Sequence, residues 1–403
     1  MSPSASRRLC VSSWDEFMSE WKTMLLEDVT TKIGSGATPR GGSNVYRSTG
    51  VKLIRSQNVL DNAMRTNDIA CITDEAANSL RGVTVESGDV LLNITGDSIA
   101  RCAVVDRRLL PARVNQHVAI IRTTSEVDPQ FLQRYLVNPV VKEALIASSS
   151  GATRNALTKG GLGKLVISFP NLVEQEAIAE VLGALDAKIS ANTKLIFTMD
   201  AHMSLSLTTA ISKERRTVAL GDVVTFHNRR RIPLSSRERE ARPGIVPYFG
   251  ASGAFDTVDV AIFDEPLVLV GEDGSVINSD GTPVVQYIWG PAWVNNHAHV
   301  LTGVGVSTEL LYIAIARDQV ATLVTGAVQP KINMGNLKRL ALTVPAGEAL
   351  REVEGLVGAQ TAAKRLIVEE SRTLAATRDA LLPQLMSGKL RVRDAEKSLA
   401  GVL

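Results

Sequence analysis

Cysteine is scarce in this sequence: Cys10, Cys71 and Cys102 are the only three among 403 residues. An odd number of cysteines without a Cys-x-x-Cys pair predicts neither a disulfide framework nor a zinc site. His297 and His299 could face a metal from one side of a strand, but no third ligand of a suitable type lies near them. We therefore expect plain polar side chains at this pair, and neither a metal site nor a cofactor.

Long apolar runs are also missing. No stretch approaches the roughly 20 consecutive apolar residues that a membrane helix needs. Two arginines near the N-terminus are not followed by the apolar segment of a secretory signal. Hydrophobic residues make up 45% of the chain and charged residues 21%, as in soluble globular proteins with ample core material. We expect a cytoplasmic protein of two to four domains, without a membrane partner.

A strong excess of positive charge is the third absence. The formal net charge is +2 at pH 7, whereas nucleic-acid-binding proteins often show a strongly basic balance. Between Pro243 and Ala316 there is no Lys or Arg at all. Any contact with DNA must therefore come from local basic patches, because the composition alone does not predict it.

The most informative feature present is an internal repeat. Four blocks occur twice in the same order: Leu26–Val29 and Leu220–Val223; Glu86–Leu92 ending at Gly96, and Glu265–Val270 ending at Gly274; Val114–His117 and Val294–His297; Gly151 followed by Lys164–Pro170, and Gly326 followed by Lys338–Pro345. After its closing proline, each half continues into a helical pattern. The order of the blocks predicts two copies of one structural unit.

Each copy begins with short β-rich runs separated by turn residues. The runs predicted as strands are 90–95, 117–122, 164–169, 267–271, 284–289 and 340–344. Glycine-rich segments such as 34–42, 271–275 and 278–281 are predicted as loops. We expect each copy to fold as a compact mixed α/β domain of about 120–150 residues.

After Pro170 the hydrophobic period changes to that of a coiled coil. Apolar positions alternate four and three residues apart in a seam formed by Ile178, Leu182, Leu185, Ile189, Asn192, Ile196, Met199 and Met203. No proline occurs between Asn171 and Arg216, so a helix of roughly 40 residues, on the order of 60 Å, is expected. Asn192 either fixes the helix register or faces solvent.

The second helical segment, from Glu348 to Leu385, is less regular. Its apolar face consists of Leu350, Val353, Val357, Ile367, Leu374, Leu381 and Leu385, and it is interrupted by Gln360, Lys364 and Ser371. The Lys364 ammonium can stay in water while its stem covers apolar surface. Pro383 falls where a helix is expected to stop or kink.

These patterns predict an α+β fold with two mixed α/β domains joined by two long antiparallel helices that form a coiled coil. The expected boundaries are a partly disordered N-terminal extension over 1–22, a first domain over 23–170, a first helix over 171–216, a second domain over 217–345, and a second helix with a C-terminal tail over 346–403. If the helices pair, the second must return along the first, which relates the domains by a pseudo-two-fold axis. Such an arrangement suits a DNA duplex with two inverted half-sites.

The order of the blocks resembles that of the specificity subunits of type I restriction–modification systems, over roughly Ser19 to Val392. The resemblance rests on five segments: Lys32–Pro39, Val114–Val118, Pro170–Ala179, Leu185–Ile189 and Leu381–Leu390. The chain departs from the family pattern in two places, because Met1–Phe17 precede its usual beginning and the second domain is poor in basic residues.

The resemblance implies a non-catalytic subunit that reads DNA. Each domain would recognise one half of a bipartite site in double-stranded DNA. The paired helices would act as a ruler for the spacer and as the docking site for two DNA-methyltransferase subunits. An ATP-dependent restriction subunit would complete the nuclease.

Candidate DNA-binding residues are those whose side chains can read base edges or hold phosphates. In the first domain they are Thr38, Arg40, Asn44, Arg47, Arg55, Gln57, Asn58, Arg154, Asn155 and Lys159, and in the second Arg229, Arg230, Arg231, Gln329 and Lys331. For each arginine, an ordinary solvated surface charge is the competing interpretation. Asn115–His117 and Asn295–His297 precede β-rich runs, and we expect structural turns there rather than base readers.

Two other classes of protein fit the sequence less well. A methyltransferase of exocyclic amines needs an Asn/Asp-Pro-Pro-aromatic motif, which Asn138-Pro139-Val140 does not satisfy. The segment 159–164 lacks the glycine spacing and Ser/Thr of a phosphate-binding loop, and the nuclease-like Glu20-Trp21-Lys22 is a tripeptide that arises by chance. A coiled-coil scaffold without DNA binding would explain the helices and the low charge of the second domain, but not the family motifs.

Overall fold

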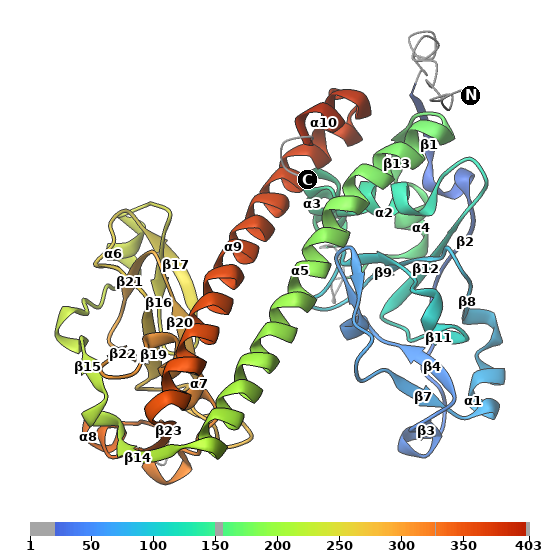
Figure 1. Cartoon of the computed structure of the whole chain (residues 1–403). Coiled ribbons are helices and arrows are strands. Elements are labelled where there is room, and N and C mark those ends of the chain that lie inside the picture. Colours follow the sequence, from blue (N-terminus) through green and yellow to red (C-terminus); the bar gives the residue numbers. More distant parts are fainter. Residues whose placement is uncertain (1–20, 150–155, 327, 400–403) are drawn as a thin grey trace, which may run out of the picture. The chain divides into compact units, whose positions relative to one another are not determined.

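The computed structural model describes residues 21–149, 156–326 and 328–399. Gly151, Arg154, Asn155 and nearly all of the expected N-terminal extension fall outside these ranges. The chain divides into two compact units, one formed by residues 1–190 with 371–403 and the other by residues 191–370. Each unit contains a globular domain and part of both long helices (Figure 1). No helix in the described ranges is both long and apolar enough to cross a membrane.

Two sheets form the first domain. An antiparallel sheet has the order β10-β9-β12-β2, with β2 Thr30–Ser35, β9 Val90–Asn93, β10 Cys102–Val104 and β12 Val118–Thr123. A mixed sheet has the order β3-β7-β4-β11-β8, with β3 Tyr46–Arg47, β4 Val51–Ile54, β7 Ala70–Ile72, β8 Thr84–Val85 and β11 Ala112–Val114. Two further strand pairs lie outside these sheets. They are β1 (Lys22–Leu25) with β13 (Val166–Phe169), and β5 (Val59–Leu60) with β6 (Ala63–Met64).

The described part of this domain also contains the helices α1 Asp74–Ser79, α2 Pro129–Val137, α3 Pro139–Ser149 and α4 Lys159–Gly163. Helix α2 begins where the Asp128 carboxylate accepts a hydrogen bond from the Phe131 N–H at 2.8 Å, which satisfies one of the free donors of the first turn. It packs on β9 and β10. Every residue of β9 is buried. Val90, Leu91 and Leu92 are apolar, and the buried Asn93 amide donates hydrogen bonds to the Ser56 carbonyl and the Ser98 hydroxyl.

The second domain repeats this plan. Its antiparallel sheet has the order β15-β22-β19-β20, with β15 Val224–Phe226, β19 Leu267–Gly271, β20 Val285–Ile288 and β22 Ala298–Gly303. A second sheet has the order β17-β16-β21-β18, with β16 Val246–Phe249, β17 Ala254–Val258, β18 Phe263–Asp264 and β21 Pro291–Val294. Strand β14 (Arg215–Ala219) pairs with β23 (Ala341–Pro345), and the helices are α6 Ser236–Glu240, α7 Thr308–Ala316 and α8 Met334–Lys338.

Matching hydrogen bonds show that the two domains are copies of one fold. The Leu26 N–H donates to the Leu165 carbonyl at 2.8 Å, and the Leu220 N–H donates to the Leu340 carbonyl at the same distance. The parallel pair β4–β11 of the first domain corresponds to β16–β21 of the second. The predicted repeat is therefore confirmed, as are all six predicted strands.

The two long helices are α5 (Leu172–Lys213) and α9 (Gly347–Met386), and a short α10 (Val392–Leu399) follows. In the unit formed by residues 191–370, successive residues of α5 contact residues of α9 that come earlier and earlier in the sequence. Asn192 contacts Glu370, Asp200 contacts Lys364, and Lys213 contacts Glu352. In the other unit Asp186 pairs with Arg378 at 2.7 Å. The contacts within residues 191–370 confirm the predicted antiparallel pairing, and the Asp186–Arg378 ion pair shows that the two helices also contact each other in the other unit.

The heptad seam of α5 is the face that packs. Leu182 and Leu185 are completely buried, and Asn192 is only 4% exposed. Of the two alternatives for Asn192, the solvent-facing one is therefore wrong. Pro383 lies inside α9, which continues three residues further to Met386.

Candidate DNA interface

The candidate DNA-binding residues Thr38, Arg40 and Asn44 lie on the connection between β2 and β3, Arg47 lies in β3, and all four are exposed. The Thr38 hydroxyl donates a hydrogen bond to Oε1 of Gln116, which brings this loop against the turn between β11 and β12. Nη1 of Arg47 donates to the backbone carbonyls of Asn44 and Tyr46, both at 2.8 Å. These contacts hold Thr38 beside Gln116 and fix the Arg47 side chain against the backbone of the preceding residues.

The next predicted group, Arg55, Gln57 and Asn58, separates in the structure. Gln57 is exposed and Arg55 is half-buried. Asn58 is fully buried; its Oδ1 accepts from the Arg55 N–H at 3.0 Å and its Nδ2 donates to the Arg65 carbonyl at 3.4 Å. Asn58 therefore supports the local backbone and offers no edge to a ligand. Lys159 is exposed in the first turn of α4.

Tight turns form at both Asn115–His117 and Asn295–His297, as expected. Oδ1 of Asn115 accepts from the His117 N–H at 3.2 Å, and Oδ1 of Asn295 accepts from the His297 N–H at 2.8 Å. The sequence did not indicate that the side chains following Asn115 and Asn295 lie at the same surface as the candidate DNA-binding residues. In the first domain Gln116 contacts Thr38, as described above.

Arg229, Arg230 and Arg231 were predicted as one basic cluster, but they have three different environments. Arg229 is exposed, and no hydrogen bond or ion pair to its side chain occurs within the described ranges. Arg230 pairs with Glu265 at 2.6 Å and lies over the Phe263 ring, 4.3 Å from its centroid. The Arg231 side chain is only 13% exposed. The cluster therefore offers one fully available cation rather than three.

Arg231 is held by a network inside the domain. It donates to Glu272 at 2.6 Å and to the carbonyls of Asn228 and Ala298 at 3.0 and 2.7 Å. The adjacent His299 is completely buried, and its Nε2 lies 2.8 Å from the Ile332 carbonyl. Burial lowers the pKa of His299 below its usual range, because desolvation penalises the charged imidazolium.

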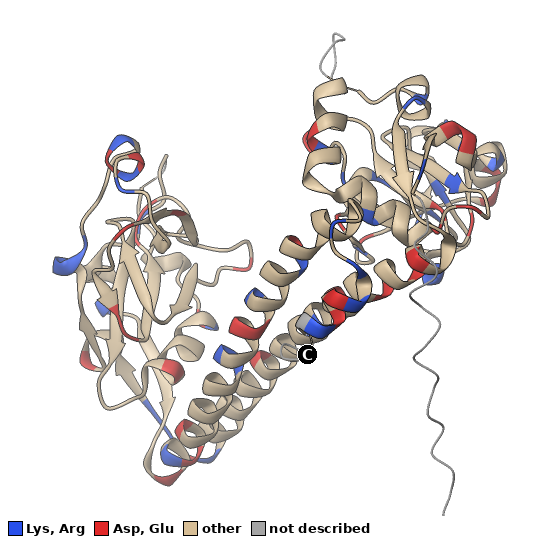
Figure 2. Ribbon diagram, turned by 90° about the horizontal axis from the view of Figure 1, so that it is seen from above, with Lys and Arg blue, Asp and Glu red and all other residues tan. Residues whose placement is uncertain are grey.

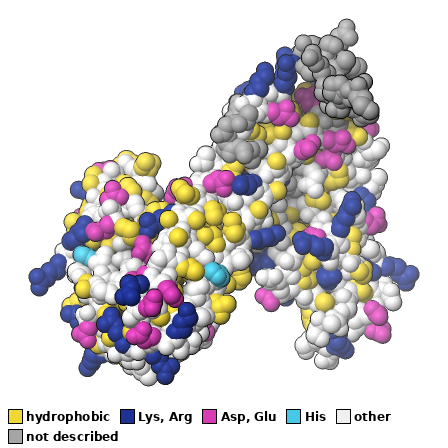
Figure 3. Space-filling view, in the orientation of Figure 1, with side chains coloured by type: hydrophobic (Ala, Val, Ile, Leu, Met, Phe, Trp, Pro, Cys, Tyr) yellow, Lys and Arg dark blue, Asp and Glu magenta, His cyan; other side chains and the backbone are white. Residues whose placement is uncertain are grey.

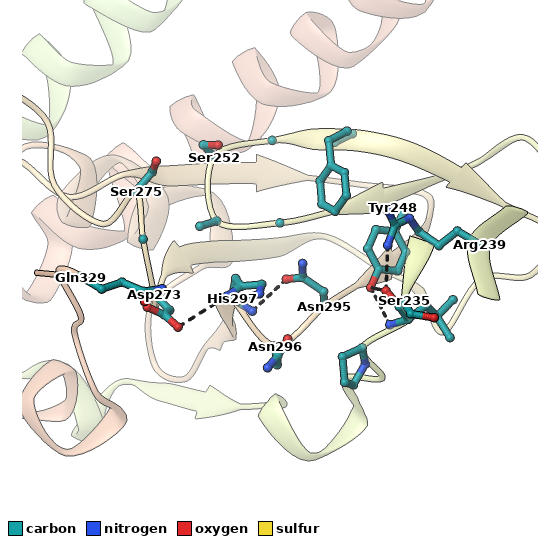
Figure 4. Close-up of a pocket in the computed structure, with 18 residues that line it drawn as sticks. Ser235, Arg239, Tyr248, Ser252, Asp273, Ser275, Asn295, Asn296, His297 and Gln329 are labelled. Atoms are coloured by element: carbon teal, nitrogen blue, oxygen red, sulfur yellow. Dashed lines mark hydrogen bonds and ion pairs between the residues drawn. The ribbon is translucent and has the colours of Figure 1, made fainter. Parts of the chain in front are cut away.

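A pocket of about 610 Å³ opens in the second domain beside this network. Among the residues that line it are Asp273, Asn296, His297 and Gln329, together with Ser252, Ser275 and Arg239. In Figure 4, Gln329, Asp273, His297 and Asn295 follow one another along one side, and Arg239 lies at the far end beside Tyr248. Gln329 was predicted from the sequence as a candidate DNA-binding residue, whereas Ser252, Asp273 and Ser275 were not. The repeat held a signal for Asp273, since it precedes Gly274 as Thr95 precedes Gly96.

The family model for the type I restriction modification DNA specificity domain matches residues 18–197 and again residues 213–354. The chain belongs to this family. The resemblance inferred from the sequence motifs is thereby confirmed, and the two matches correspond to the two copies of the repeat.

Two curated proteins of Haemophilus influenzae are similar to parts of this chain. A putative type I restriction enzyme specificity subunit of Haemophilus influenzae is 27% identical over 144 residues, which cover 36% of this chain and 36% of that protein. The HindI specificity subunit of the same organism is 25% identical over 186 residues, 45% of this chain and 39% of that protein. The chain thus aligns with less than half the length of either curated relative.

A solved structure of the family shares the fold. The type I restriction–modification S subunit from M. genitalium superimposes with a TM-score of 0.59 at 16% identity, covering 92% of this chain and 96% of that one. The expected fold class, α+β with two repeated mixed domains and two long helices, is therefore confirmed.

Positive charge in the second specificity domain lies away from its central strands. No Lys or Arg occurs between Pro243 and Ala316, and the strands of that segment accordingly carry none (Figure 2). Lys331 is exposed in the loop that pairs with Asp273 through an isolated bridge. Among the described residues, no group of three or more His, Cys, Asp or Glu could hold a metal ion. Any positive charge that this domain offers to a ligand must therefore come from residues outside the segment between Pro243 and Ala316.

Proposed function

We propose that this chain is the DNA-sequence-recognition subunit of a type I restriction–modification complex and reads a bipartite target. The observation that carries the proposal is the duplicated match to the DNA specificity domain over residues 18–197 and 213–354. Two copies of one reader on a single chain suit a target with two half-sites.

Each domain would contact DNA through its exposed candidate residues. In the first domain these are Thr38, Arg40, Asn44, Arg47, Gln57 and Lys159, and in the second Arg229, Gln329 and Lys331, all of which are exposed. Arg55 is half-buried and Arg230 is paired with Glu265, so both are less available to DNA. Arg154 and Asn155 remain candidates from the sequence. Asn58 and Arg231 would support the interface from inside, because their polar groups already have protein partners.

The long helices would set the spacer length and dock two methyltransferase subunits. Large apolar side chains remain exposed on them, with Phe197 at 76% and Leu366 at 74%. Figure 3 shows hydrophobic side chains at the surface along these helices. Exposed apolar patches commonly mark protein interaction sites. An ATP-dependent restriction subunit would join the same complex.

The chain itself would be non-catalytic and would act in the cytoplasm. The methyl transfer and the DNA cleavage would be performed by its partners, and this subunit would direct both to one sequence. Purified alone, it should therefore methylate and cleave no DNA.

The test is to express the full chain with its cognate methyltransferase subunit and to map methylation across the genome by long-read sequencing. A bipartite motif that appears only when both proteins are present is expected. Methyl transfer by the isolated chain would overturn the non-catalytic assignment. Absence of both a motif and salt-dependent DNA binding would favour the alternative of a coiled-coil scaffold.

A further inference from the structure

The two domains contain one equivalent site whose backbone is the same and whose side chains differ. In the first domain the Ile94 N–H donates to the His117 carbonyl at 3.0 Å, and in the second the Glu272 N–H donates to the His297 carbonyl at 2.8 Å. The next residue is Thr95 in one domain and Asp273 in the other. Each forms an isolated bridge, Thr95 with Ala156 and Asp273 with Lys331. Each is followed by a glycine with positive φ, 75° at Gly96 and 83° at Gly274.

The side chains at this site face the neighbouring turn. Oγ1 of Thr95 lies 2.6 Å from Nδ1 of His117, and Oδ2 of Asp273 lies 3.7 Å from Nδ1 of His297 (Figure 4). The residue before the histidine is Gln116 in the first domain and Asn296 in the second. Two domains that recognise different base sequences need the same backbone with different polar side chains at the base edges.

In the second domain this site forms one end of the 610 Å³ pocket. Ser252, Ser275, Asn296 and Gln329 line the pocket and are exposed. Within the described ranges, their side chains form no hydrogen bond with another protein group. Their donors and acceptors are therefore available to a ligand.

The charge of the pocket excludes a phosphate as that ligand. Arg239 is the only Lys or Arg among the residues that line it, and it is already paired with Asp256 at 2.5 Å. The Asp273 carboxylate would repel a phosphate, and its oxygens can only accept hydrogen bonds when ionised. In the major groove, the donors that DNA presents are exocyclic amino groups, and carboxylates accept from them.

We propose that this pocket receives a base edge of the second half-site, and that Asp273 accepts a hydrogen bond from the exocyclic amino group of that base. Asn296 and Gln329 contact the same or the adjacent base pair. Thr95 and Gln116 occupy the corresponding place in the first domain. The proposal rests on the proposed function, which supplies the DNA, and it assigns the phosphate contacts to cations outside the pocket, such as Arg229 and Lys331.

The test uses the full chain in complex with its methyltransferase subunit and the variant Asp273→Asn. The amide is nearly isosteric but can donate as well as accept, so it tolerates guanine O6 or thymine O4 where the carboxylate does not. We expect discrimination at one base pair of the second half-site to fall by about 5- to 150-fold, with the first half-site unchanged. Duplexes with cytosine or adenine at that position distinguish the two possible sources of the amino group.

Asp259→Asn is the matched control, because it removes the same charge from an exposed position of the same domain outside the pocket. It should leave every base preference unchanged. If Asp273→Asn does not fold, Gln329→Ala tests the pocket assignment instead. Gln329 is exposed, so its truncation removes only a proposed base contact. An unchanged motif with full methylation in Asp273→Asn, or in Gln329→Ala when that variant decides, overturns the pocket assignment. A wild-type complex that reads no bipartite motif overturns the proposed function instead.

Discussion

Nη1 of Arg231 donates a hydrogen bond to Oε2 of Glu272 at 2.6 Å, and both side chains are more than four-fifths buried. The same Nη1 lies 3.2 Å from the Asn296 carbonyl and 2.7 Å from the Ala298 carbonyl. Arg231 thus fastens the turn that carries His297 to the end of strand β19. A residue predicted to contact DNA instead holds in place the side chains that form the pocket.

Arg231→Ala should lower the free energy of unfolding of the second domain by about 3 kcal/mol, because Glu272 would remain largely buried without its partner. Urea unfolding followed by circular dichroism measures this loss. Arg230→Ala is the matched control. Its ion pair with Glu265 is 47% and 39% exposed, and this pair together with the contact between Arg230 and the Phe263 ring contributes at most about 2 kcal/mol. Equal losses in the two variants would contradict the structural role of Arg231.

Arg229→Ala should weaken DNA binding without changing stability. If Arg229 neutralises one phosphate, the slope of log affinity against log salt should become shallower by about 0.9. The measurement is a titration of the complex with its duplex at several salt concentrations. Arg351→Ala, which removes an exposed arginine from α9, should leave the slope unchanged. An unchanged slope in Arg229→Ala would make this residue ordinary solvated surface.

Lengthening both long helices by one heptad should lengthen the spacer of the recognised site. Seven residues inserted after Ser190 in α5 and seven after Glu370 in α9, where the two units of the chain meet in sequence, preserve the heptad phase to within about 20°. They add roughly 10 Å, which corresponds to about three base pairs at 3.4 Å each. Methylation mapping of the variant complex reports the new motif.

Five-residue insertions at the same two positions are the control for the helix extension. They rotate the seam by about 140° at 100° per residue and should abolish assembly or recognition. If the seven-residue variant changes the half-sites while the spacer stays fixed, the helices do not act as a ruler.

The second domain should lose stability in mild acid through His299. Burial lowers the pKa of this imidazole, although the Ile332 carbonyl and Glu272 oppose the shift; Arg231 and Lys331 act in the same direction as burial. The unfolded chain therefore takes up a proton near the ordinary pKa of 6.5 that the folded domain does not bind. The stability contributed by the neutral form is complete above that pH and is lost as the pH falls through the lower folded pKa.

The test is to measure the free energy of unfolding at pH 7.5 and at about pH 5.5, because the ordinary histidine pKa lies between these two values. The loss between the two should be smaller in His299→Gln than in the wild type, whatever the stability of the variant at pH 7.5. His202→Gln, which changes an exposed histidine on α5, should show the wild-type loss. The same pH dependence in all three proteins would place the acid sensitivity elsewhere, for example at His227, whose pKa is also lowered by burial.

The sequence by itself determined the duplicated architecture of this protein. Strands such as β9 and β19 are short runs of mostly apolar residues bounded by turn residues, and helix α5 carries a sustained heptad seam. Patterns of this kind depend on neighbours along the chain and on burial of one face, and so they can be recognised in one dimension. The antiparallel pairing of α5 and α9 followed from the order of the blocks alone.

The tertiary structure alone decided which polar residues are available to DNA. Arg229 and Arg231 are two residues apart and have the same side chain, yet one is exposed and the other is bound to Glu272. Asn58 and Asp273 differ for the same reason. Asn58 is enclosed by the backbone of its own loop, whereas Asp273 lies beside a turn 24 positions away, at His297. Hydrogen-bond partners distant in sequence determine whether a polar group faces a ligand, and only the folded chain brings those partners together.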